Sequence, residues 1–164
     1  FSRGRLIHRY DKIHLFKPTG DPKFFSRGSK AGTFMLRAGA SSVRAGVVIC
    51  YDLRFPELMR TMALDGMQIL FVPARWPVAR DEAWQTLLKA RAMENQIFVV
   101  GCDSLDDEGC YSYAFNPMGR MILTSRKQHG KPLQTFQIDF RELDEARKLH
   151  RNLDEAVFLR ERLA

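Results

Sequence analysis

Cys50 is the residue of this chain best suited to act as a nucleophile, because it ends an apolar run and begins an abrupt turn. The apolar residues 46–49 predict a buried strand, and the proline-containing stretch 51–57 predicts that the chain turns directly after the thiol. Open α/β sheets bind their ligands at the edge where such strands end. A thiol there can attack an electrophilic carbon if it is activated. A buried structural cysteine is the alternative.

Lys12 is the second residue with evident chemical potential. It lies in the segment Tyr-Asp-Lys-Ile-His-Leu-Phe at residues 10–16, at the end of a strand expected over residues 5–10. An ammonium group beside apolar residues at a strand end is suited to stabilise a developing oxyanion. A solvated surface lysine is the alternative. His14 lies in the same segment, so a Cys50–His14 dyad is a further alternative.

These segments, in this order, resemble the nitrilase superfamily of carbon–nitrogen hydrolases. The resemblance runs from about Arg5 to about Asp139. The turn Cys-Tyr-Asp-Leu-Arg-Phe-Pro is similar to that of the branch containing ω-amidases and the amidases that remove deaminated glutathione. The stretches that carry the resemblance are 10–16, 50–57, Ala-Arg-Trp-Pro at 74–77, Ala-Arg-Ala-Met-Glu-Asn-Gln at 90–96 and Asn-Pro-Met-Gly at 116–119.

The resemblance implies thiol-dependent hydrolysis of a small carboxamide, or less readily a nitrile or carbamoyl compound. Cys50 would attack the carbon to form a thioester, ammonia would depart, and water would release the acid. Lys12 and the backbone N–H of Tyr51 would stabilise the oxyanion. The resemblance implies no metal and no organic cofactor.

Arg75 and Trp76 are candidate substrate-binding residues, because they follow an expected strand that ends at the same edge. The resemblance expects an asparagine at position 75, and an arginine there could hold a substrate carboxylate. An ordinary packed tryptophan is the alternative for Trp76.

The chain departs from the family's pattern at both catalytic glutamates. The base glutamate of the family belongs to a stretch far upstream of the lysine segment. The second glutamate is expected in the loop before Gly28, where Asp21 and Lys23 stand instead. Asp21 is one methylene shorter and is a possible second acid. These departures favour an alternative function, a non-catalytic remnant or subunit of the same fold.

Short apolar strands alternate with amphipathic helices, which predicts an α/β protein. The resemblance implies an α-β-β-α sandwich, of which residues 1–164 form the C-terminal portion of a single hydrolase domain, with a helical extension over 140–164. One sheet face is then expected to lie uncovered. The expected strands are 5–10, 33–36, 43–49, 68–72, 97–102, 111–115, 121–124 and 134–138, and the expected helices are 56–64, 81–95, 139–150 and 154–162.

The composition excludes some classes of partner. The net charge is +7, but no nucleic-acid-binding motif accompanies it, so we expect no nucleic-acid function. No apolar run is long enough to span a bilayer. Three cysteines without a metal-site spacing favour a reducing, cytoplasmic location. We expect a small amide as substrate and a homo-oligomer, a dimer or larger.

Overall fold

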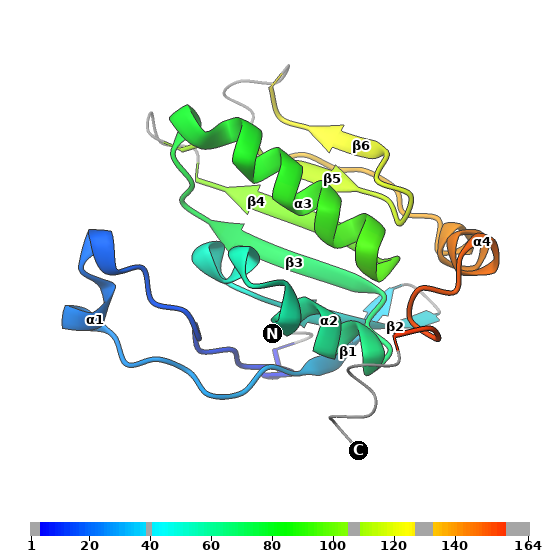
Figure 1. Cartoon of the computed structure of the whole chain (residues 1–164), viewed down its shortest axis with the longest axis horizontal. Helices are drawn as coiled ribbons and strands as arrows, with labels where there is room; N and C mark the ends of the chain where they lie inside the picture. Colours follow the sequence, from blue (N-terminus) through cyan, green and yellow to red (C-terminus); the bar gives the residue numbers. More distant parts are fainter. Residues whose placement is uncertain (1–3, 39–40, 105–108, 127–132, 157–164) are drawn as a thin grey trace.

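A six-stranded sheet with helices on one face forms the body of the molecule (Figure 1). The structure is a computed structural model that describes residues 4–38, 41–104, 109–126 and 133–156. Strands β2, β3 and β4 are parallel, and the pairs β1–β2, β4–β5 and β5–β6 are antiparallel. The expected α/β class is therefore confirmed. The strands are β1 (Thr33–Ala38), β2 (Ser41–Val47), β3 (Ile69–Ala74), β4 (Phe98–Asp103), β5 (Tyr113–Phe115) and β6 (Met121–Thr124).

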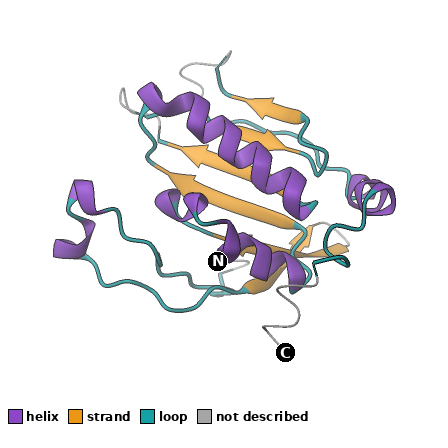
Figure 2. Ribbon diagram, viewed as in Figure 1, coloured by secondary structure: helices purple, strands orange, loops and turns teal. Residues whose placement is uncertain are grey.

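Two helices connect the parallel strands and lie on the same face of the sheet (Figure 2). Helix α2 (Pro56–Leu64) begins with a proline at its first turn, where a missing N–H costs nothing. Helix α3 (Asp81–Asn95) ends at Gln96, whose backbone is left-handed with φ 50°. Both helices agree with the bounds expected from the sequence.

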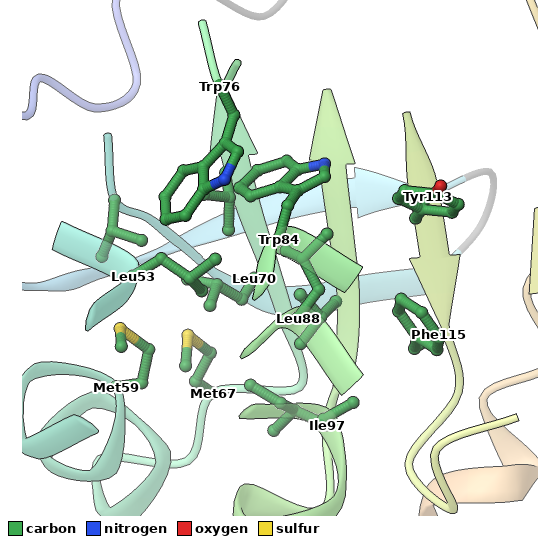
Figure 3. Close-up of a cluster of buried hydrophobic side chains, with 14 of the residues drawn as sticks. Leu53, Met59, Met67, Leu70, Trp76, Trp84, Leu88, Ile97, Tyr113 and Phe115 are labelled. Carbon is green, nitrogen blue, oxygen red and sulfur yellow. The ribbon is translucent and has the colours of Figure 1, made fainter. Parts of the chain in front are cut away.

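The main hydrophobic core lies between these helices and the sheet (Figure 3). Burying large side chains of this kind stabilises a fold by about 1.5–3 kcal/mol each. The helices also approach the strands closely, because a side chain at Gly101 would overlap Leu88 and Trp84 of α3. The largest side chains drawn in this core are Leu53, Met59, Met67, Leu70, Trp76, Trp84, Leu88, Ile97, Tyr113 and Phe115.

A second apolar cluster covers the other face of the sheet, where the sequence led us to expect an uncovered surface. Its seven fully buried members are at most 8% exposed. The reason is that Phe136, Ile138 and Phe140, which precede helix α4 (Arg141–Leu149), fold back onto this face with Leu143. The expectation is corrected for this cluster, although Phe34, Leu36 and Phe71 at its margin remain only partly buried. The buried members are Val43, Ala45, Ile69, Phe98, Val100, Ala114 and Leu143.

Two of the expected strands are wrong. Residues 5–10 form no strand of the sheet and are held by side chains instead: the His8 ring stacks on Phe34 with centroids 4.6 Å apart. Residues 134–138 run as an irregular segment whose alternate side chains pack on the second cluster. The apolar residues of both segments gave them a strand-like pattern in the sequence, but neither forms part of the described sheet. Most of the helix expected at 154–162 falls outside the described residues, and 154–156 form no helix.

The described residues also form four short helical turns that the sequence did not predict, two of which follow β2 and β3. They are η1 (Lys17–Thr19), α1 (Asp21–Phe24), η2 (Cys50–Arg54) and η3 (Val78–Arg80). Figure 1 shows the loop bearing α1 extending away from the body of the sheet. In the part of the chain that the structure describes, no helix is long and apolar enough to cross a membrane.

Candidate active site

Cys50 stands at the carboxyl end of β2, where the sequence places the nucleophile. It opens the turn η2 with φ 49°, a left-handed conformation that is uncommon for a residue with a side chain. Its side chain is partly buried, and its Sγ lies 3.8 Å from the backbone carbonyl oxygen of Arg75, at the end of β3. Strained backbone of this kind is concentrated at functional sites, where the surrounding structure holds it in place.

Asp52 joins the two motifs that the sequence singled out. Its carboxylate is fully buried, and one oxygen accepts the backbone N–H of Ile49 at 3.1 Å. The Tyr10 hydroxyl donates to it at 2.8 Å, and the backbone N–H of His14 donates at 2.7 Å. The lysine segment is thereby fixed against the nucleophile turn. Burial, followed by the hydrogen bond to Asp52, raises the pKa of Tyr10 far above its ordinary value, so Tyr10 stays a donor.

Arg91 supports the nucleophile turn from the side of helix α3. Its Nε and Nη2 donate to the carbonyl oxygen of Leu53 at 3.1 and 2.9 Å. Its Nη1 pairs with Glu94 at 3.0 Å, three residues further along the helix. The sequence interpretation of Arg91 and Glu94 as a structural ion pair agrees with this geometry.

Lys12 and Asp21 form an ion pair beside the turn. Lys12 Nζ lies 2.7 Å from Asp21 Oδ2, and the two side chains are 19% and 17% exposed. Burial alone would raise the pKa of Asp21, but donors from Lys12, the Phe16 backbone and Thr19 outweigh it and lower this pKa to about 2. Asp21 is therefore ionised at neutral pH and keeps a negative charge against the Lys12 ammonium.

The Cys50 thiol has a raised pKa, chiefly because burial disfavours the thiolate. The positive charge of Lys12 and the backbone N–H of Tyr51 act in the opposite direction and stabilise the thiolate, while the carboxylate of Asp103 destabilises it. Lys12 and the Tyr51 N–H thus both lie close enough to the Cys50 sulfur to act on its charge. In the chain as described, the thiol is protonated at neutral pH and requires a base.

Arg75 and Trp76 lie at the same sheet edge but differ in exposure. Trp76 is only 3% exposed: its ring stacks on Trp84 with centroids 5.2 Å apart, and its Nε1 donates to the carbonyl oxygen of Arg80. Arg54 lies over the ring, 4.8 Å from its centroid. Arg75, by contrast, is exposed. The geometry therefore gives Trp76 a packing role and leaves Arg75 accessible to a solute.

His14 is oriented toward Asp52. Its Nδ1 lies 2.9 Å from Asp52 Oδ1, and its ring stacks on Phe55 with centroids 3.6 Å apart. Among the described residues, the side-chain hydrogen bond of Cys50 goes to the Arg75 carbonyl. The structure thus gives no support to a Cys50–His14 dyad.

A cavity of about 650 Å³ opens beside the nucleophile turn, on the side of the loop that carries α1. Its lining includes the aromatic side chains of His14, Tyr51 and Phe55 and the cations Lys17 and Arg27. The cavity is bounded by the two motifs that Asp52 joins.

Asp103 is a residue of the site that the sequence analysis missed. It is the last residue of β4, and its carboxylate acts on the Cys50 sulfur across the ends of the parallel strands. The rule that identified Cys50 and Trp76, namely a polar or reactive residue directly after a buried strand, applies equally to Asp103.

The chain belongs to the carbon–nitrogen hydrolase family, which it matches over residues 1–148. It is 41% identical over 142 residues to a "hydrolase in agr operon" of Staphylococcus lugdunensis, covering 83% of this chain and 59% of the relative. It is 36% identical over 152 residues to the 2-oxoglutaramate amidase of Bacillus subtilis, covering 90% of this chain and 56% of the relative. The chain thus spans a little over half the length of these curated relatives.

The fold is similar to a solved structure of the same class. Saccharomyces cerevisiae Nit3, described as a member of branch 10 of the nitrilase superfamily, superposes with a TM-score of 0.76 at 26% sequence identity. The match covers 90% of this chain and 54% of that one. The family resemblance inferred from the motifs is thereby confirmed.

Proposed function

We propose that this chain carries the nucleophile portion of an amidase that hydrolyses a small carboxamide to the acid and ammonia. Cys50 Sγ attacks the carboxamide carbon as its proton passes to a base, the C–N bond breaks, and the protonated nitrogen leaves as ammonia. Water then attacks the thioester carbon, the C–S bond breaks, and the acid departs with the thiol restored. The supporting observation is that Cys50 opens a turn with left-handed backbone after β2, and that the buried Asp52 carboxylate ties the segment bearing Lys12 to this turn.

The proposed substrate is a small amide that also bears a carboxylate. Arg75 supports this, because it presents an exposed cation at the strand end next to Cys50. The similarity to a 2-oxoglutaramate amidase points to the same chemistry, an ω-amide of a 2-oxo acid. Asp21 is proposed to assist by holding the Lys12 ammonium in place, since the two atoms lie 2.7 Å apart.

The general base is the component that the described side chains do not supply. Asp21 is too acidic for this task at a pKa of about 2, because efficient general bases have pKa values near the working pH. Asp52 is fully buried and already accepts several hydrogen bonds. We propose that the base is a glutamate upstream of the lysine segment, as the resemblance to the family implies.

A second candidate function is that of a non-catalytic subunit of the same fold. The observation that favours it is the raised pKa of the Cys50 thiol, whose described hydrogen-bond partner is the Arg75 carbonyl rather than a base. For either function we propose a homo-oligomer and a reducing, cytoplasmic location. The exposed Phe24 and Phe25 support the homo-oligomer, and the free cysteines Cys50, Cys102 and Cys110 support the reducing location.

The test is release of ammonia from 2-oxoglutaramate by this chain joined to the upstream segment that carries the proposed base glutamate, measured with a coupled dehydrogenase assay. We expect Cys50→Ala to remove the activity, and Arg75→Gln to raise KM by about tenfold with little change in kcat, as expected for loss of a charged contact. A neutral amide of similar length is the control and should show no effect of Arg75→Gln. Turnover by Cys50→Ala would refute the proposal, and no turnover by the unaltered chain would favour the non-catalytic subunit.

A further inference from the structure

Asp103 lies where the ends of the parallel strands converge on the nucleophile. It is the last residue of β4 and is paired in register with Ala74, the last residue of β3. The residues that follow β3 are Arg75 and Trp76, and β2 leads into Cys50. A negative side chain therefore stands at the same edge of the sheet as the thiol.

The Asp103 carboxylate is occupied by backbone donors. The N–H of Trp76 lies 2.9 Å from one oxygen and 3.2 Å from the other, and the N–H of Ser104 donates at 2.7 Å. The N–H of Cys110 also bonds to this carboxylate. Backbone donors thus hold the carboxylate in place, and among the described residues the hydrogen bond of the Cys50 thiol goes to the Arg75 carbonyl rather than to Asp103. Asp103 therefore contacts the thiol indirectly.

These hydrogen bonds connect Asp103 to the sulfur through one peptide unit. The Trp76 N–H that Asp103 holds belongs to the same peptide group as the Arg75 carbonyl, because the peptide bond is planar. That carbonyl oxygen lies 3.8 Å from Cys50 Sγ and accepts from the thiol. Fixing the N–H thus also fixes the direction of the carbonyl that contacts the nucleophile.

We propose that Asp103 is a positioning residue for the nucleophile. Asp103 orients the Arg75–Trp76 peptide so that the Arg75 carbonyl accepts a hydrogen bond from the Cys50 S–H. The negative charge of Asp103 also counteracts the positive charge of Lys12, so the thiol keeps its proton until a base removes it. This inference rests on the proposed function for one premise, that Cys50 is the nucleophile. Oxidants and alkylating agents attack the thiolate. Asp103 therefore protects Cys50 from them in the resting state by keeping the thiol protonated.

The charged groups around the thiol support this division of roles. Lys12, from the N-terminal segment, favours the thiolate, and Asp103, from β4, disfavours it. Asp103 itself has a raised pKa, because burial outweighs its hydrogen bonds. Burial raises the pKa of the Cys110 thiol as well, and the negative charge of Asp103 adds to that effect. Asp81 bonds directly to Cys110 Sγ at 2.7 Å, so it is a second carboxylate next to a different cysteine.

The test is the pH profile of Cys50 alkylation by iodoacetamide without substrate, followed by peptide mass spectrometry that resolves Cys50 from Cys102 and Cys110. Asp103→Asn keeps an acceptor for the Trp76 N–H but removes the charge. We expect it to speed Cys50 alkylation at pH 7 by roughly three- to tenfold, because losing the nearby negative charge lowers the pKa of the thiol. Asp103→Ala removes both features and should also change the Trp76 near-ultraviolet circular dichroism.

The matched control is Asp81→Asn, which neutralises the buried carboxylate beside Cys110 and should leave the Cys50 profile unchanged. An Asp103→Asn profile equal to that of the unaltered chain would overturn the proposal. An equal acceleration of Cys50 alkylation by Asp81→Asn would also overturn it, because it would indicate that either substitution makes the fold less rigid. Because the labelling needs no turnover, its outcome does not depend on the amidase assay. A chain inactive as an amidase would still show the charge effect.

Discussion

At the scale of single residues, the carboxylates around Cys50 serve to build the site. Asp52 ties the lysine segment to the nucleophile turn, Asp21 pairs with Lys12, and Asp103 holds the peptide that contacts the sulfur. Each accepts hydrogen bonds from its neighbours; these lower the pKa of Asp21 to about 2, whereas burial outweighs them and raises the pKa of Asp103. In the proposed mechanism, the described chain supplies the nucleophile and the oxyanion donors, and the base comes from elsewhere.

The Lys12–Asp21 pair gives a prediction about pH. The pKa of Asp21 is lowered from 3.8 to about 2 in the folded chain, so its stabilising contribution is present above about pH 4 and is lost as the pH falls toward 2. Because the pair is in partial contact with solvent, we expect a contribution of about 1 kcal/mol. Urea unfolding of the unaltered chain and of Asp21→Asn should show a stability difference at pH 5 that shrinks between pH 4 and pH 2. A constant difference over this range would show that Asp21 does not act through this ion pair.

At the scale of elements, the nucleophile and its neighbours could be located from the sequence because they depend on local patterns. A buried strand followed by a turn was enough to place Cys50 and Trp76 at one edge, and Pro56 was enough to mark the start of α2. Residues 5–10 and 134–138 were mistaken for strands, because a short run with apolar residues does not reveal whether a neighbouring strand exists. Whether the long loop bearing α1 turns back depends on contacts distant in sequence, such as the Gly28 N–H bonding to the Lys12 carbonyl at 2.7 Å.

The site was less predictable than the fold, for a physical reason. Arg75 is exposed and Trp76 is buried because of the way η3 and helix α3 pack after β3. The residues next to Arg75 and Trp76 in the sequence do not determine this packing. Asp103 followed the same strand-end rule as Cys50, but its partners are backbone groups from three other places in the chain. A carboxylate at a strand end can equally face solvent, so the sequence alone did not reveal its role.

The packing of helix α3 on β4 gives a prediction at this scale. A methyl group at Gly101 would overlap Leu88 and Trp84, so Gly101→Ala should displace the helix from the strand that ends at Asp103. We expect a loss of about 1–3 kcal/mol in the free energy of unfolding, as for other overpacked cores. Gly32→Ala is the control, because a side chain there meets no atom within 4 Å, and it should change stability by less than about 0.5 kcal/mol. Equal effects of the two substitutions in urea unfolding would contradict the close packing.

At the scale of the whole molecule, the described chain forms one sheet that is apolar on both faces. Helices α2 and α3 cover one face, and residues 133–140 with α4 cover a cluster on the other. The net charge of +7 is what remains when the 19 acidic residues are set against the 26 basic ones, some of which form ion pairs such as Arg126–Asp81 and Arg141–Asp139. The molecule resembles its family in fold over most of its length, while it spans a little over half of its curated relatives.

The central claim, that Cys50 forms a thioester with an amide substrate, is tested most directly by mass spectrometry of the chain, joined to the upstream segment with the proposed base, after rapid acid quenching with 2-oxoglutaramate. The account predicts a mass increase equal to the substrate minus ammonia, located on the Cys50 peptide, removed by hydroxylamine and missing from Cys50→Ala. Acid produced without an adduct on Cys50, or an adduct on Cys102 or Cys110 instead, would contradict the account.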